Sequence, residues 1–122
     1  MQKIIIVEDD PMLIDIYKMK FSNSGFEVFV AENGKVALEI AKKEKIDIVL
    51  TDLFMPEMDG FELTKILRSG EYDSDIKIIV FSNLDQEDSQ KKFAGLKING
   101  YITKSNYSPA ELVDEVKKII QQ

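Results

Sequence analysis

The chain has 122 residues, 44% of them hydrophobic, and a formal net charge of −6 at pH 7, so it suits a single domain with its own core. It contains no Cys, His or Trp, which excludes disulfides, cysteine nucleophiles, Ser-His-Asp triads and metal sites held by Cys or His. The acid excess argues against direct nucleic-acid binding, and the longest wholly apolar run, residues 4–7, is too short to span a membrane. We therefore expect a cytoplasmic domain whose chemistry uses carboxylates, hydroxyls, lysines and the backbone.

Short segments rich in β-branched residues alternate along the chain with longer segments whose apolar residues have helical spacing. The predicted strands are residues 3–7, 26–30, 46–51, 76–81 and 100–103. The predicted helices are residues 11–23, 35–44, 61–67, 86–94 and 109–121. Start and stop signals for these helices are Asp10-Pro11, Ser24-Gly25, Asn33-Gly34, Asp59-Gly60 and the capping box Ser108-Pro109-Ala110-Glu111.

Strands that alternate with helices favour a parallel sheet covered on both faces. Five such units joined by right-handed crossovers indicate an α/β fold: a doubly wound, flavodoxin-like sheet of five parallel strands with five helices, in one domain spanning residues 1–122. The near-continuous apolar segments 4–7 and 78–81 suit interior strands, whereas residues 26–28 alternate and suit an edge. We expect the strand order 2-1-3-4-5.

Acidic residues follow two strands that are neighbours in this order. In such sheets the ligand lies beyond the carboxyl ends of the strands, where the strand order reverses. Glu8 and Asp9 follow the first predicted strand, and Asp52 follows the third. Three carboxylates within about 4–6 Å repel one another unless a cation lies between them. Oxygen ligands at a mouth open to water suit Mg²⁺, so we expect a magnesium site here, with the backbone carbonyl of Phe54 as a further ligand.

Each candidate residue also has a purely structural interpretation. Asp10 is suited to cap the first helix, and Asp52 to begin a turn. Ser82, after the fourth strand, would by default be a loop or capping hydroxyl, while Tyr101 would be a core residue and Lys104 a solvated lysine. Their joint placement favours function, because these residues lie at the ends of successive strands of one predicted sheet.

The chain resembles the receiver domain of bacterial two-component response regulators over nearly all of its length. The resemblance is carried by four stretches: Ile5-Ile6-Val7-Glu8-Asp9-Asp10-Pro11, Thr51-Asp52-Leu53-Phe54-Met55-Pro56-Glu57-Met58-Asp59-Gly60, Val80-Phe81-Ser82-Asn83 and Gly100-Tyr101-Ile102-Thr103-Lys104. The spacing between Asp9, Asp52, Ser82 and Lys104 also resembles that of the family.

The resemblance implies a role for each of these polar residues. Asp52 would accept a phosphoryl group. Asp9 would bind Mg²⁺ directly, and Glu8 through water. Ser82 would donate a hydrogen bond to a phosphoryl oxygen, and Lys104 would pair with the phosphoryl group or, before transfer, with Asp52. A carboxylate is already ionised at pH 7 and needs no general base, so the lack of His is no obstacle.

The function implied by the resemblance is a phosphorylation-activated switch. A sensor histidine kinase or phosphotransfer protein would donate the phosphoryl group from a phosphohistidine, and the domain would catalyse only its own phosphorylation and slow autodephosphorylation. Ser82 moving toward the phosphoryl group would let Tyr101 turn inward, which would change the surface of residues 86–94, 100–103 and 109–121. That surface would control a downstream output protein or domain; a phosphorylation-dependent homodimer through its two helices stays open.

The sequence departs from the family pattern around the expected site. Ser105 follows Lys104 where the family usually has Pro in a cis bond, and because a cis bond before Ser costs about 2.5–4 kcal/mol, we expect a trans bond here. Asn83 stands where a small residue is usual and would narrow access to the phosphoacceptor. Phe54 and Leu84 are both apolar, and we hypothesise that they shield the phosphoryl group from water and slow its hydrolysis.

Three other functions compete with this interpretation. A phosphatase of the haloacid-dehalogenase type needs a second Asp two residues after the nucleophile, where this chain has Phe54. A flavodoxin-like FMN carrier needs a loop after the first strand that accepts phosphate, and Glu8-Asp9-Asp10 would repel it. A receiver-like binding module that is never phosphorylated is favoured by Asn83 and Ser105 and opposed by the complete set of site residues.

Overall fold

The computed structural model describes residues 1–83, 91, 93 and 95–121. All strand pairs are parallel, and the sheet order β2-β1-β3-β4-β5 confirms the prediction. The strands are β1 (Lys3–Val7), β2 (Glu27–Ala31), β3 (Ile48–Asp52), β4 (Lys77–Ser82) and β5 (Gly100–Thr103). The helices are α1 (Pro11–Asn23), α2 (Gly34–Lys43), α3 (Gly60–Leu67) and α5 (Pro109–Ile120), with a 3-10 turn, η1 (Lys104–Asn106).

The described residues therefore contain four α-helices, not the five predicted. The prediction of a helix over residues 86–94 falls on a segment in which only residues 91 and 93 are described. The remaining predicted helices are all present, with ends that differ by no more than one residue.

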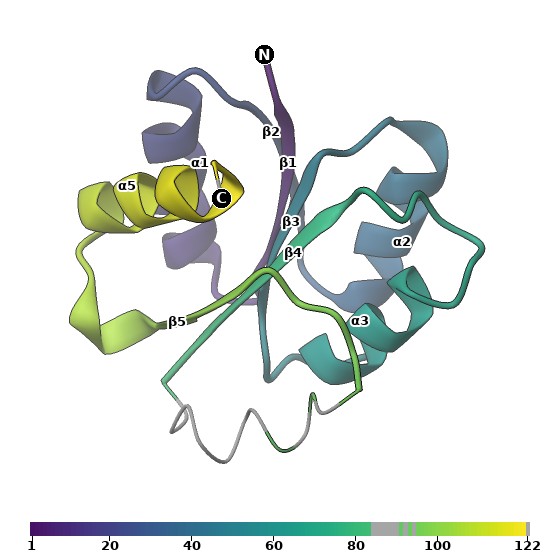
Figure 1. Ribbon diagram of the computed structural model, residues 1–122. Coiled ribbons are helices and arrows are strands. Elements are labelled where there is room, and N and C mark those ends of the chain that lie inside the picture. Colours follow the sequence, from purple (N-terminus) through teal and green to yellow (C-terminus); the bar gives the residue numbers. More distant parts are fainter. Residues whose placement is uncertain (84–90, 92, 94, 122) are drawn as a thin grey trace.

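Helices cover both faces of the sheet, as Figure 1 shows: α1 and α5 lie on one side, and α2 and α3 on the other. The cluster on the first side includes Phe21 of α1 and Val116 of α5, and the cluster on the second includes Ala37 of α2 and Leu63 of α3. Residues 4–7 of β1 are fully buried, because a parallel strand with helices on both faces has no solvent side.

The predicted caps are confirmed at four helix starts, and they explain why two helices begin one residue early. Asp10 accepts a hydrogen bond from Met12 N, and Ser108 forms the capping box with Glu111. Asn33 accepts from the N–H of Val36, so α2 begins at Gly34. The Asp59 carboxylate accepts from Glu62 N, so α3 begins at Gly60.

Strand ends differ from the prediction in a way that concerns the site. Asp52 and Ser82 are the last residues of β3 and β4, not the first residues after them. Asp52 pairs with Phe81 and Ser82 with Thr103 in the ladder, so the ladder fixes both backbones. Both side chains therefore start from rigid positions. The predicted bounds of β1 and β5 are confirmed at both ends, and the remaining bounds of β2, β3 and β4 shift by one or two residues.

The opposite edge of the sheet, where the strands begin, lies next to both ends of the chain. Met1 and Gln121 line a pocket of about 500 Å³ there together with Gly25 and Phe26.

None of the helices in the described residues is long and apolar enough to cross a membrane.

Candidate functional site

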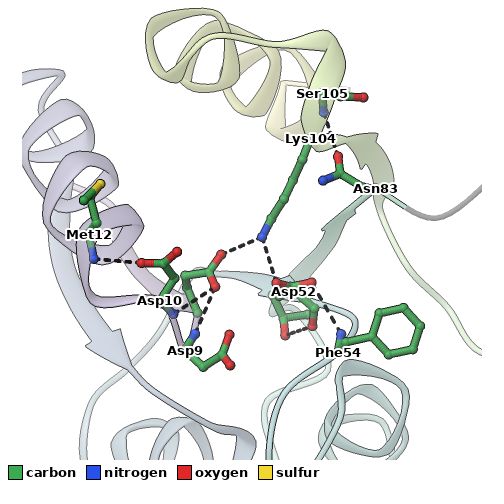
Figure 2. Close-up of polar contacts among 10 residues, drawn as sticks. Asp9, Asp10, Met12, Asp52, Phe54, Asn83, Lys104 and Ser105 are labelled. Carbon is green, nitrogen blue, oxygen red and sulfur yellow. Dashed lines mark hydrogen bonds and ion pairs between the residues drawn. The ribbon is translucent and has the colours of Figure 1, made fainter.

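The polar residues singled out from the sequence meet at the carboxyl ends of the strands. Glu8 and Asp9 follow β1, Asp52 ends β3, Ser82 ends β4, and Lys104 follows β5. Because neighbouring parallel strands end at one edge, residues far apart in the chain come together. Figure 2 shows Lys104 extending toward Asp52 across this edge.

Glu8 is a buried carboxylate, with 1% of its surface exposed, and both of its oxygens have partners. Oε2 accepts hydrogen bonds from the N–H groups of Asp9 and Asp10 at 3.0 and 3.2 Å. Oε1 accepts from Lys104 Nζ at 2.6 Å. Burial raises the pKa of Glu8 above its ordinary value of 4.5, and the ammonium of Lys104 and the backbone bonds partly oppose that rise.

Asp9 completes a cluster of three carboxylates. Carboxylate oxygens of Glu8, Asp9 and Asp52 lie within 4.8 Å of one another, and Asp9 is the exposed member. Three carboxylates against one ammonium leave a local excess of negative charge that favours a bound cation. The donor set consists only of oxygens, which is the set preferred by Mg²⁺.

Asp52 is 8% exposed, and its two oxygens have different environments. Oδ2 accepts from Lys104 Nζ at 2.7 Å, and Oδ1 accepts a longer bond from the N–H of Phe54, at 3.4 Å. The backbone of Asp52 lies against the start of α3, where a Cβ added to Gly60 would come 2.4 Å from the Asp52 carbonyl oxygen. Glycine is therefore required for this close approach.

Lys104 joins the two buried carboxylates and also lies over an aromatic ring. Its Nζ is 4.7 Å from the centroid of the Phe81 ring, which is within the range of a cation–π contact. Burial lowers the pKa of Lys104, but the hydrogen bonds and charges of Asp52 and Glu8 outweigh burial, so the pKa lies above its ordinary value of 10.5. Lys104 is consequently a fixed cation at neutral pH.

A pocket of about 350 Å³ opens beside the phosphoacceptor candidate and is lined by Asp52, Phe54, Ser82, Asn83 and Lys104. Ser82 is 2% exposed, whereas Phe54 is 57% exposed at the rim. The pocket has space for a tetrahedral anion between a hydroxyl and an ammonium. The structure thus brings together these predicted residues; Leu84, predicted as the second shielding residue, lies outside the described residues.

Tyr101 lies on β5, the edge strand next to β4. It pairs with Val80 in the β4–β5 ladder and is half-buried against the cluster of Leu53, Val80 and Phe93. It does not belong to the pocket lining. Tyr101 lies on the strand next to the one that ends at Ser82. Its predicted role as a switch residue stays a proposal.

A family model for the response regulator receiver domain matches residues 4–117. The chain belongs to this family. The receiver domain is 30% identical over 121 residues to the alkaline phosphatase synthesis transcriptional regulatory protein PhoP of Bacillus subtilis, a match that covers 99% of this chain and 49% of PhoP. It therefore spans about half the length of this curated relative.

Solved structures show the same fold. Chemotaxis protein CheY4 of Vibrio cholerae superposes with a TM-score of 0.89 at 24% identity, covering 98% of each chain, which supports the fold. Response regulator TrrA of Thermotoga maritima, solved in complex with Mg(2+)-BeF, superposes with a TM-score of 0.82 at 29% identity, covering 98% of this chain and 99% of TrrA.

Two contacts of this receiver domain were missed by the sequence analysis. The first is the Phe81 ring under Lys104; strand alternation alone cannot show that the lysine following β5 reaches the face of β4 on which Phe81 lies. The second is a hydrogen bond of 2.9 Å from the N–H of Ser105 to Asn83 Oδ1. The Lys104–Ser105 peptide bond itself is trans, as expected. Asn83 and Ser105 were both identified as unusual, but nothing in the sequence pairs them.

Proposed function

We propose that this receiver domain is a phosphorylation-activated switch in which Asp52 accepts a phosphoryl group from the phosphohistidine of a partner kinase. The observation that carries the proposal is the shared ammonium: Lys104 Nζ bonds Asp52 Oδ2 at 2.7 Å and Glu8 Oε1 at 2.6 Å, beside a third carboxylate and a pocket. A strand-end carboxylate held this way is oriented beside a fixed cation and faces a pocket on one side. Those are the requirements of a phosphoryl acceptor.

Mg²⁺ fits the acidic cluster. Asp9 and Asp52 would hold it, with Glu8 acting through water and the backbone carbonyl of Phe54 as a further ligand. The exposed carboxylate of Asp9 keeps the cluster accessible to a hydrated ion, and the similar TrrA was solved with Mg(2+)-BeF. Bound there, the cation supplies positive charge that offsets the repulsion between Asp52 and an incoming dianion.

The chain's own residues then perform the transfer. A carboxylate oxygen of Asp52 forms a bond to phosphorus while the bond from phosphorus to the histidine nitrogen of the partner breaks, and the product is an acyl phosphate. Lys104 shifts its hydrogen bond from Asp52 to a phosphoryl oxygen, and Ser82 donates its hydroxyl to another. Both residues offset charge spread over the equatorial oxygens. Water later cleaves the acyl phosphate, so the domain catalyses slow autodephosphorylation and no metabolic reaction.

The signal leaves the site through the residues around Ser82. Its movement toward the phosphoryl group draws in Tyr101, which repacks the surface of β5 and α5. The predicted helix over residues 86–94, expected to share this surface, falls on a segment in which only residues 91 and 93 are described. A phosphorylated aspartate adds about −1.5 to −2 charge, which shifts the balance between two arrangements of this surface. The surface controls an output protein or domain and is where a phosphorylation-dependent homodimer would form.

A partner that delivers the phosphoryl group must cover the mouth of the site. Helix α1 begins beside the acidic cluster and exposes Met12, Ile16 and Met19 at helical spacing. Exposed apolar side chains at one face of a helix suit a protein partner. The partner we propose is a sensor histidine kinase or a phosphotransfer protein.

Incubation with Mg²⁺ and acetyl phosphate, followed by intact-mass measurement, tests the proposal. We expect a phosphoryl mass gain that requires Mg²⁺ and is absent in Asp52→Asn. Beryllofluoride should change the spectrum of the wild type and leave Asp52→Asn unchanged. If the wild type gains neither mass nor bound beryllofluoride, the domain is instead a phosphorylation-independent binding module, as its unusual Asn83 and Ser105 would then suggest.

A further inference from the structure

We propose that Asn83 is a positioning residue for Lys104: its side-chain oxygen holds the backbone at Ser105 and thereby places the Lys104 ammonium between its two carboxylates. The inference rests on the phosphorylation function proposed above and extends it to a residue that lines the pocket with Asp52 and accepts a hydrogen bond from the backbone of the turn after β5. Figure 2 shows Asn83 and Ser105 joined beside the base of the Lys104 side chain.

The bond extends the connection between β4 and β5 past the end of their ladder. The last ladder pair is Ser82 with Thr103. Beyond it the backbones diverge, because the chain turns into η1 at Lys104. The bond from Ser105 N to Asn83 Oδ1, at 2.9 Å, connects the two loops one step further along. The segments that follow β4 and β5 are thus hydrogen-bonded to each other next to Lys104.

Asn83 also supplies a cap that the turn itself lacks. Thr103 is the N-cap of η1 and makes no side-chain capping hydrogen bond. The N–H of Ser105, at the start of the turn, has no acceptor within so short an element. The Asn83 oxygen acts in place of an N-cap side chain, from a different strand end. Loss of this acceptor frees the turn that begins at Lys104.

The lysine tolerates little displacement. Its Nζ has three partners: Glu8 at 2.6 Å, Asp52 at 2.7 Å and the Phe81 ring at 4.7 Å. A shift of the backbone at Lys104 must be absorbed by the long side chain or by these contacts. Misplacement of a catalytic group by about 1 Å is enough to slow a reaction strongly. A hydrogen bond at Ser105 that holds the backbone next to Lys104 therefore affects the rate of phosphorylation.

Amine labelling by acetic anhydride, read by mass spectrometry, tests the placement of Lys104 without requiring phosphorylation. In Asn83→Ala we expect the labelling rate of Lys104 to rise roughly fivefold, the factor that corresponds to one hydrogen bond of about 1 kcal/mol. Labelling of Lys3, which pairs with Glu44 at 3.0 Å, is the internal control and should not change. Urea unfolding of Asn83→Ala should stay near that of the wild type.

Two matched variants separate positioning from a general loop defect. Ser105→Ala removes the hydroxyl group and keeps the backbone N–H, so labelling of Lys104 should equal that of the wild type. Asn83→Asp keeps an oxygen acceptor and should restore slow labelling, although its charge makes it unsuitable for measuring phosphorylation. The initial rate of phosphorylation by acetyl phosphate should fall roughly fivefold in Asn83→Ala.

The proposal is overturned if Lys104 in Asn83→Ala labels at the wild-type rate, or if Asn83→Asp labels as fast as Asn83→Ala. A phosphorylation rate unchanged in Asn83→Ala, with wild-type phosphorylation intact, would equally refute it. Failure of the proposed function gives a different result: the wild type is not phosphorylated at all, while the labelling comparison still reports on the placement of Lys104.

Discussion

Lys104 Nζ lies 2.6 Å from Glu8 Oε1, a contact between residues 96 positions apart in the chain. The carboxylate is almost completely buried, so its charge depends on this ammonium. Removing one partner of a buried ion pair leaves an uncompensated charge, which costs more than the pair contributes. The pair is therefore a sensitive point for stability as well as for chemistry.

Lys104→Met should make stability more dependent on pH. Burial already holds the pKa of Glu8 above 4.5, and loss of the opposing ammonium raises it further. A raised pKa means that Glu8 binds its proton more tightly in the folded state than in the unfolded state. The stability that protonated Glu8 contributes is therefore full below pH 4.5 and is lost as pH rises through the folded-state pKa. Urea unfolding between pH 4.5 and 8 should show a deficit that grows to about 3 kcal/mol. Parallel curves would contradict this, and Lys118→Met, at an exposed position of α5, is the control.

Asp9→Asn should stabilise the metal-free protein and weaken its response to Mg²⁺. It removes one of three carboxylates that lie within 4.8 Å of one another, and at this exposed position we expect a gain of about 1 kcal/mol. Added MgCl₂ should raise the midpoint of urea unfolding in the wild type and much less in the variant. Asp10→Asn keeps the helix cap and should respond as the wild type does; equal Mg²⁺ responses in all three proteins would refute the proposed ligand set.

Gly60→Ala should disturb Asp52 from outside the site. The added Cβ would meet the Asp52 carbonyl oxygen at 2.4 Å and Leu53 Cα at 3.1 Å, and backbone cannot yield cheaply. We expect a loss of about 1–3 kcal/mol in stability together with slower phosphorylation. Gly34→Ala is the matched control, because its Cβ meets the flexible side chain of Met58. Equal losses in both variants would argue against a specific contact at Asp52.

Phe54→Asn should shorten the lifetime of phosphorylated Asp52 severalfold. The Phe54 ring is 57% exposed at the rim of the pocket, and under the shielding hypothesis its replacement lets water reach the acyl phosphate more easily. Decay after removal of acetyl phosphate, followed by intact mass, measures the effect. Met12→Asn changes an even more exposed apolar residue, 71% exposed, away from that rim and should decay at the wild-type rate. A half-life in Phe54→Asn no shorter than that of the wild type contradicts shielding.

Sequence patterns were sufficient for the sheet and for the location of the site. Buried parallel strands such as β1 are continuous apolar runs, and caps such as Asp10 and Ser108 mark helix starts locally, so both are visible without coordinates. The order of strands then brings Glu8, Asp9 and Asp52 together, because they end neighbouring strands.

Side-chain contacts between residues at the ends of different strands were not predictable from the sequence. Whether Phe81 lies under Lys104 depends on which face of β4 carries Phe81 and on the direction in which η1 sends the Lys104 side chain, and neither has a local signal. The bond between Asn83 and Ser105 is of the same kind, since each residue alone resembles an ordinary loop residue. Strand ends were placed one residue short at Asp52 and Ser82, because a polar residue looks like a stop signal even where its backbone still pairs.

The placement of Met1 and Gln121 around one pocket, at the edge where the strands start, has a practical consequence. A fluorophore or affinity handle joined at either extremity points away from the acidic mouth. Immobilised or dye-labelled versions of the protein should therefore exchange magnesium and phosphodonors freely, which makes surface-based kinetic assays feasible without redesigning the fold.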